Sequence, residues 1–204
     1  EYDTAFFDKR SKFLVYRPHN LVLANVEFDH ADIFASLEEY ALSFRRLVNL
    51  VPGNGFVVVN AGDPLAAEIA APCRGRVIAV APGDPAPWDF PLPGEHFRTD
   101  ALLAAAAAAQ LGLSPEQIAR GMAAYRGVKR RLEAIFAGGG VTLYDDFAHH
   151  PTAIRLDLET LRAKHPGARI RALFEPRSNT LRRAIFQEAL PAAFAAADEV
   201  IVGA

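Results

Sequence analysis

Cysteine is nearly absent from the sequence. Cys73 is the only one in 204 residues, so the chain can form no intrachain disulfide and no cluster of thiolate metal ligands. Such scarcity is typical of proteins in a reducing compartment, and it indicates a cytoplasmic location.

Long apolar runs are also lacking. The longest run, 101–109, consists mostly of alanine and is far shorter than the ~20 residues needed to cross a bilayer. The first residues show no signal-peptide pattern. We therefore expect a protein that does not interact with membranes.

Neither sign of charge is in large excess. The formal net charge is −2 and the isoelectric point is about 6.3. A general basic field for nucleic acid or an anionic membrane surface is therefore excluded. Lys and Arg gather only locally, at 126–131 (RGVKRR).

Apolar residues are plentiful, at 51% of the chain, and 23% of residues are charged. This composition predicts a well-packed globular protein, and the length suits one large domain or two small ones. The chain begins with Glu1 rather than Met and stops just after a strand-like segment begins. We therefore expect a fragment of a longer protein.

Strand-like and helix-like segments alternate along the chain. The continuous apolar runs at 21–25 and 56–60 indicate strands that are buried on both faces. Further strands are expected at 77–81, 132–137, 141–145, 169–174 and 199–202, and helices at 37–51, 64–71, 96–111, 114–124, 181–194 and from Pro151 onward. This alternation predicts an α/β fold with mostly parallel sheets. The pattern of segments changes after Gly127, and we place a domain boundary near 126–131, which divides the chain into 1–126 and 127–204.

Local signals mark some of these boundaries. Ser36 with Glu39, and Ser114 with Gln117, are spaced as capping boxes at helix starts. Three glycines at 138–140 join two strand-like runs and indicate a hairpin.

Three polar clusters follow predicted strands, where ligands bind in open α/β sheets. The first is NVEFDHAD at 25–32, in which carboxylates flank His30. This mixture of ligands holds divalent cations near phosphates. Alternatively, Asp29 and Asp32 merely cap the next helix.

The second cluster is DDFAHHPT at 145–152. Its adjacent histidines can bind metal, act as acid and base, or hydrogen-bond a ligand. A pair of histidines is more often solvated surface, but this one lies between an acidic pair and a helix N-terminus, which is a ready anion site.

The third cluster is EPRSNT at 175–180. Arg177 can grip a carboxylate or phosphate with two hydrogen bonds, and the neighbouring hydroxyl and amide groups can add to this. A plain turn with a helix cap would look similar. The basic segment at 126–131 can reach phosphates, or it is a solvated linker.

The phosphate-loop pattern GxxxxGK[ST] does not occur in the sequence. None of the four lysines, Lys9, Lys12, Lys129 and Lys164, has that setting. If the protein uses ATP, the element that cradles the phosphates is not part of these 204 residues.

Five segments in order, EYDTAFFDKRSKF, NVEFDHADIF, GVKRRLE, YDDFAHHPTAI and FEPRSNT, resemble the Mur ligase family, the ATP-dependent amide ligases of bacterial cell-wall synthesis. The resemblance covers essentially the whole chain. It implies that 1–126 is part of the central ATPase-type domain, without its phosphate loop, and that 127–204 is the first part of a Rossmann-like C-terminal domain.

Within the family, the motifs resemble members that join the murein tripeptide L-Ala-γ-D-Glu-meso-diaminopimelate to UDP-N-acetylmuramate during peptidoglycan recycling. The implied mechanism uses ATP and Mg²⁺: ATP phosphorylates the muramyl carboxylate, and the tripeptide amine attacks the acyl phosphate. Members that add L-alanine have a QPHRYTRT-like segment in place of FEPRSNT. An alanine-adding ligase and a degenerate, non-catalytic nucleotide-binding domain are the alternatives.

The resemblance also implies residue roles. His30 matches a metal-ligand histidine and is the first catalytic candidate. Arg131 matches the hinge arginine that reaches the ATP phosphates, and is the second catalytic candidate. Asp146 and His149 match the part that meets the nucleotide.

A further group of candidates contacts the substrate. Arg177, Ser178 and Asn179 match positions that meet the incoming amino acid or peptide, and we expect them to bind the tripeptide's carboxylates. His150, beside the acidic pair that meets the nucleotide, is also assigned to the substrate.

Some positions depart from the family's pattern. The adenine motif GxHNxxN is GEHFRTD at 94–100, so His96 remains a nucleotide-binding candidate while Phe97 and Asp100 replace asparagines. Asp100 is still assigned to the nucleotide. No lysine follows the DHxD segment where some members carry a carbamylated one; Arg45 and Arg46 lie in that region. Glu1 matches the last residue of an EADE stretch whose first glutamate binds metal.

Overall fold

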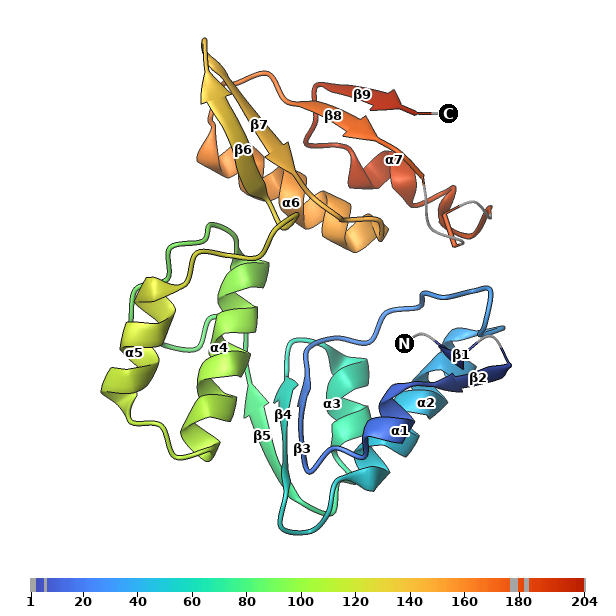
Figure 1. Ribbon diagram of the computed structural model, residues 1–204. Coiled ribbons are helices and arrows are strands. Elements are labelled where there is room, and N and C mark those ends of the chain that lie inside the picture. The colour runs from blue at the N-terminus through green and yellow to red at the C-terminus, as the bar shows by residue number, and fades with distance from the viewer. Residues whose placement is uncertain (1–2, 6, 177–179, 182–183, 204) are drawn as a thin grey trace. The chain divides into compact units, whose positions relative to one another are not determined.

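The structure is a computed structural model that describes residues 3–5, 7–176, 180–181 and 184–203 (Figure 1). It divides into two compact units. The first unit contains residues 1–90 and 97–124, and the second contains 91–96 and 125–204. The elements in chain order are β1 (Asp3–Ala5), β2 (Asp8–Ser11), α1 (Phe13–Tyr16), β3 (Asn20–Leu23), α2 (Leu37–Leu50), β4 (Phe56–Asn60), α3 (Pro64–Ala70), β5 (Arg76–Val80), α4 (Glu95–Gln110), α5 (Pro115–Ala124), β6 (Glu133–Gly138), β7 (Val141–Asp145), α6 (Pro151–Lys164), β8 (Arg171–Phe174), the 3-10 helix η1 (Ala184–Phe186), α7 (Leu190–Ala193) and β9 (Glu199–Val202).

The first unit is built on a parallel sheet in the order β3-β4-β5. Its central strand β4 is buried on both faces, as its apolar run predicts. Val57 and Val59 pack with α2 and α3, whereas Val58 packs with Leu102 and Leu103 of α4. Helices therefore cover both faces of this sheet (Figure 1), which is the usual arrangement for parallel strands.

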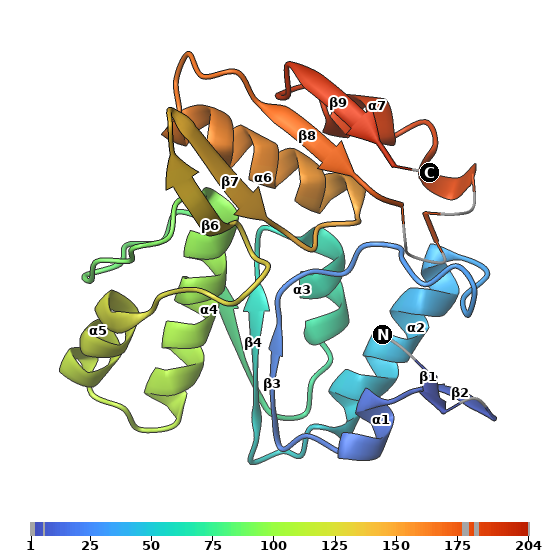
Figure 2. The same cartoon turned by 45° about the horizontal axis from the view of Figure 1, so that its top comes forward.

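The second unit contains an antiparallel hairpin and a parallel pair. The hairpin β6-β7 turns at Gly139 and Gly140, whose φ angles of 57° and 75° suit a two-residue turn. The parallel pair is β8-β9. Ile154 and Leu158 of α6 share an apolar cluster with Ala172 and Phe174 of β8. The helix α6 runs alongside β8 in both views (Figures 1 and 2). Parallel sheets with covering helices confirm the predicted α/β fold class.

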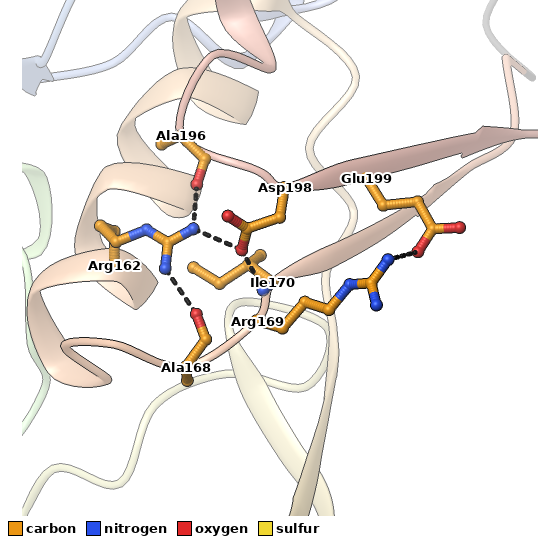
Figure 3. A network of polar contacts seen from close by, with 7 residues as sticks. All are labelled: Arg162, Ala168, Arg169, Ile170, Ala196, Asp198 and Glu199. Carbon is orange, nitrogen blue, oxygen red and sulfur yellow. Dashed lines mark hydrogen bonds and ion pairs between the residues drawn. The ribbon is translucent and has the colours of Figure 1, made fainter.

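Arg162 fastens the C-terminal part of α6 to the segments that lead into β8 and β9. Its guanidinium donates to the carbonyls of Ala168 and Ala196, at 2.5 and 3.0 Å, and to Asp198 at 2.7 Å. The same Asp198 oxygen accepts the Ile170 N–H at 2.7 Å (Figure 3). One side chain thus satisfies two loop carbonyls and orients the start of the parallel pair.

Two expectations from the sequence are wrong. The run at 21–25 does not form a strand buried on both faces: in the described residues β3 is an edge strand, and Val22 is 45% exposed. The helix expected over 181–194 is replaced, among the residues described there, by η1 and the single-turn α7. Pro191 explains part of this, because proline lacks an N–H and clashes with the preceding helical turn.

Candidate functional site

The carboxyl edge of the first sheet carries the predicted 25–32 cluster, and Asp63 ties this cluster to the sheet. Asp63 Oδ1 accepts the N–H groups of Leu65 and Ala66 at 2.9 and 3.0 Å, so it caps α3. Asp63 Oδ2 accepts the N–H of Val26 at 2.7 Å. The carboxylate therefore serves the start of α3 and the loop after β3 at the same time.

His30 lies within this loop in an uncommon backbone conformation. Its φ angle is 53°, in the left-handed region that few residues other than glycine adopt. Its N–H donates to Asp29 Oδ1 at 2.7 Å, and its carbonyl accepts from Ile33 and Phe34 at 2.8 and 3.0 Å. Such backbone outliers cluster at functional sites, which supports a role for His30.

The described residues do not complete a metal centre. Among them, no group of three or more His, Cys, Asp or Glu side chains is arranged to hold an ion. One histidine supplies only one of about six ligands that Mg²⁺ requires, so His30 stays a predicted ligand. The alternative that Asp29 and Asp32 cap the next helix does not hold either, since Ser36 Oγ accepts the Glu39 N–H and caps α2.

Asp146 organises the loop between β7 and α6 in the second unit. Its two oxygens accept the N–H groups of Leu132 at 2.6 Å and Ala148 at 2.5 Å. Burial raises the pKa of the Asp146 carboxyl above its usual value, and the charge of Asp157 acts in the same direction. The two N–H donors and Arg131 act in the opposite direction. Desolvation together with a charged neighbour makes Asp146 a candidate for a functional position.

The two histidines of this loop point their Nδ1 atoms at the backbone. His149 Nδ1 lies 3.0 Å from the Phe147 carbonyl, to which it can only donate. His150 Nδ1 accepts the Thr152 N–H at 3.3 Å and caps α6, so this nitrogen carries no proton there. The His150 ring also packs edge-on against Phe186, at 4.9 Å between centroids. His150 therefore has a structural task beside its predicted one.

His96 meets Asp157 inside the second unit. His96 Nε2 lies 3.2 Å from Asp157 Oδ1, and both side chains are largely shielded from solvent. Gly94 passes so close to α6 that an added Cβ would lie 2.6 Å from Thr160 Oγ1. The segment 94–96 is thus fitted against α6. Asp100 is exposed and belongs to the first unit.

Arg131 lies beside the Asp146 loop. Its guanidinium is 5.7 Å from the centre of the Phe147 ring, and that of Arg130 is 4.9 Å away. The Phe147 N–H donates to the Arg130 carbonyl at 3.0 Å, which joins the basic segment to the loop. The second unit therefore gathers Arg131, Asp146 and, through Asp157, His96 in one neighbourhood.

Arg177, Ser178 and Asn179 lie outside the described residues. Two positions were missed by the sequence reasoning. No sequence pattern could have identified Asp157, since it looks like an ordinary polar residue on a helix. Asp63 has one, because an aspartate directly before Pro64 at a helix start is a typical N-cap.

Sequence profiles identify both halves of the chain. Residues 5–89 match the Mur ligase middle domain, and residues 130–203 match the domain described as Mur ligase, glutamate ligase domain. The two matches together span most of the chain. The chain therefore belongs to the Mur ligase family.

Individual relatives agree with this assignment. Over 99% of its length the chain is 40% identical to the UDP-N-acetylmuramate–L-alanyl-gamma-D-glutamyl-meso-2,6-diaminoheptandioate ligase of Escherichia coli K12, of which it covers 50%. It is 41% identical over 93% of its length to a UDP-N-acetylmuramate–L-alanine ligase of Nocardioides, of which it covers 44%. The chain thus spans about half the length of the curated relatives it matches.

Solved structures show the same likeness. The murein peptide ligase of Psychrobacter arcticus matches 99% of the chain and 47% of its own length, with a TM-score of 0.69 and 31% identity. MurF of Acinetobacter baumannii matches 93% of the chain and 51% of its own length, with a TM-score of 0.74. At 19% identity the second similarity concerns the fold alone.

Proposed function

We propose that these residues belong to an ATP-dependent amide ligase that joins L-Ala-γ-D-Glu-meso-diaminopimelate to UDP-N-acetylmuramate through an acyl phosphate, in cytoplasmic peptidoglycan recycling. The observation that carries this proposal is the 40% identity to the E. coli enzyme over 99% of the chain. Because the chain spans about half of that relative, the activity is assigned to a ligase of full family length that contains these residues. We place the boundary between its middle and C-terminal domains at 126/127.

The second unit supplies the nucleotide contacts in this proposal. Asp146 uses one lone pair on each oxygen for the loop N–H groups, and an ionised carboxylate has about four lone-pair sites. It can therefore also accept ribose hydroxyls. Arg131 stabilises negative charge on the phosphates, and His149 and His96 add to the nucleotide contacts of this unit. Asp100, which belongs to the first unit, is assigned to the nucleotide separately.

The substrate contacts are assigned from the sequence alone. We assign His150 to the peptide substrate, and Arg177, Ser178 and Asn179 to the carboxylates of that peptide. Guanidinium groups bind carboxylates with two parallel hydrogen bonds, which suits a tripeptide that carries several of them.

Mg²⁺ is proposed as the metal because phosphoryl transfer requires neutralisation of the charge that develops on the transferring group. His30 is its proposed ligand and a proposed catalytic residue. The remaining ligands are not found among the described residues.

An L-alanine ligase is the second candidate, and the 41% identity to the Nocardioides enzyme favours it. The amine substrate separates the two. A ligase of full family length that contains residues 1–204 is supplied with UDP-N-acetylmuramate, ATP and Mg²⁺, and with either the tripeptide or L-alanine. We expect ADP release that depends on the tripeptide. Release that depends on alanine but not on the tripeptide contradicts the proposal.

The 204-residue chain by itself serves as the control. Its sequence has no phosphate-loop motif, so it should release no ADP with either amine. ADP release by the chain alone would show that another element of the chain holds the phosphates.

A further inference from the structure

A cavity of about 460 Å³ lies within the second unit, because every residue that lines it belongs to that unit. Its walls are segments 91–93, 126–129 and 131–134, together with Tyr144 and Lys164. It therefore joins the basic segment, the strand β7 and the C-terminal end of α6.

The cavity wall is strongly positive. Four cationic side chains line it, and Glu133 is the single carboxylate among the lining residues: Arg126, Lys129, Arg131 and Lys164 are the cations. Glu133 Oε2 already accepts the Arg130 N–H at 2.9 Å. In the described part of the chain, neither Lys129 nor Lys164 is paired with a carboxylate. Two lysines without carboxylate partners, with Arg126 and Arg131 in the same wall, favour a multivalent anion.

The Lys164 end of the cavity lies away from the nucleotide-facing loop, whereas Leu132, which also lines the cavity, donates its N–H to Asp146 of that loop. Lys164 ends α6, whereas His149 and His150 precede its first residue, Pro151. A helix of 14 residues is about 20 Å long, so Lys164 and the two histidines lie at opposite ends of it. Arg131 reaches toward both places, because it lines the cavity and also lies over Phe147.

One wall is held in place by side-chain contacts. Tyr144 Oη lies 2.8 Å from His165 Nε2, and Lys164 Nζ lies 5.2 Å from the centre of the Tyr144 ring. Leu92, Val128 and Leu132 add an apolar strip. A fixed aromatic ring, an apolar strip and converging cations fit an organic phosphate better than a bare inorganic ion.

We propose that this cavity is a second anion site, which binds the diphosphate group of an organic phosphate through Lys129, Lys164, Arg126 and Arg131. Arg131 is shared with the proposed function, which assigns it to the ATP phosphates, whereas Lys129 and Lys164 belong to this cavity alone and carry its test.

Inorganic pyrophosphate is the first probe, titrated into the isotope-labelled 204-residue chain and followed by NMR and calorimetry at low salt. We expect shifts at Lys129, Leu132 and Lys164. Lys129→Ala and Lys164→Ala should each weaken binding about three- to fivefold, which corresponds to the loss of one partly solvated charge contact. Sodium chloride should weaken it further.

Arg155→Ala is the matched control, because Arg155 is a cation of the same helix that pairs with Glu159 and does not line the cavity. The affinity of Arg155→Ala for pyrophosphate should stay unchanged, and Lys164→Arg should still bind pyrophosphate. Thermal melts check that each variant is folded. ADP and UDP, titrated in the same way, distinguish an adenine from a uracil nucleotide as the source of the diphosphate.

Three results would overturn the proposal. They are the absence of any shift at the cavity residues, shifts confined to 147–152, and equal weakening by Arg155→Ala and Lys164→Ala. The last result would mean that the anion is attracted only by the general charge of the unit.

Discussion

Asp63 and Val26 are joined by a 2.7 Å hydrogen bond that links the loop after β3 to the start of α3. Because the other Asp63 oxygen caps α3, the two tasks can be separated. In Asp63→Asn the remaining oxygen can cap the helix, but the amide nitrogen cannot accept the Val26 N–H. Asp63→Ala loses both.

We expect hydrogen exchange in Asp63→Asn to accelerate at Val26 and through 27–34, while α3 stays protected. In Asp63→Ala both regions should exchange faster, with a loss of stability of roughly 1–3 kcal/mol from the cap and the unsatisfied N–H. Asp84→Asn is the control, since Asp84 accepts a backbone N–H within its own turn, from Ala81. Unchanged exchange at 26–34 in Asp63→Asn would show that Asp63 does not hold the loop.

Arg162→Ala should destabilise the second unit by roughly 1–3 kcal/mol, because two loop carbonyls and Asp198 lose their donor (Figure 3). Urea unfolding measures this. Arg155→Ala, which removes an exposed pair within one helix, should cost at most about 0.5 kcal/mol. Equal effects of the two variants would contradict a special role for the Arg162 contacts.

Asp198 should make the second unit sensitive to acid. The hydrogen bond from Arg162, followed by that from the Ile170 N–H, lowers the pKa of Asp198 in the fold. The ionised group therefore stabilises the fold above its unfolded pKa of about 3.9, and this contribution is lost as pH falls through the lower folded value. Asp198→Asn should be less stable at neutral pH and lose less stability in acid. If the free energy of unfolding of Asp198→Asn and of the unsubstituted protein changes equally with pH over that range, this role of Asp198 is contradicted.

The pKa of Asp146 should respond in opposite directions to its two charged neighbours. Burial and Asp157 raise it, whereas Arg131 lowers it. Asp157→Asn should therefore lower the pKa of Asp146, and Arg131→Ala should raise it further. Carbon-detected NMR titration of the carboxyl group measures both changes. A shift of the same sign in both variants would contradict this electrostatic account.

Local sequence signals predicted local structure well. Ser114 and Gln117 form the expected reciprocal cap, with Gln117 Oε1 accepting the Ser114 N–H at 2.7 Å. The hairpin at 138–140 and the doubly buried β4 also follow from their own residues. In these cases the interactions that decide the structure lie within a few positions or depend on the apolar pattern alone.

Longer-range relationships could not be predicted in the same way. The apolar run at 21–25 resembles a central strand, and only the order of the strands among the described residues places β3 at an edge. His150 was proposed as a ligand contact, but its use as the α6 cap depends on ring orientation. The approach of His96 to Asp157 joins residues 61 positions apart, and no local pattern encodes it.

The central claim is that the muramyl carboxylate is activated as an acyl phosphate before the amine attacks it. The most direct measurement uses UDP-N-acetylmuramate with isotopically labelled carboxylate oxygens, turned over with ATP, Mg²⁺ and the tripeptide by a full-length ligase containing residues 1–204. Our account predicts that labelled oxygen appears in the inorganic phosphate, because the carboxylate oxygen that attacks ATP leaves with the phosphoryl group. Amide product accompanied by unlabelled phosphate would contradict it.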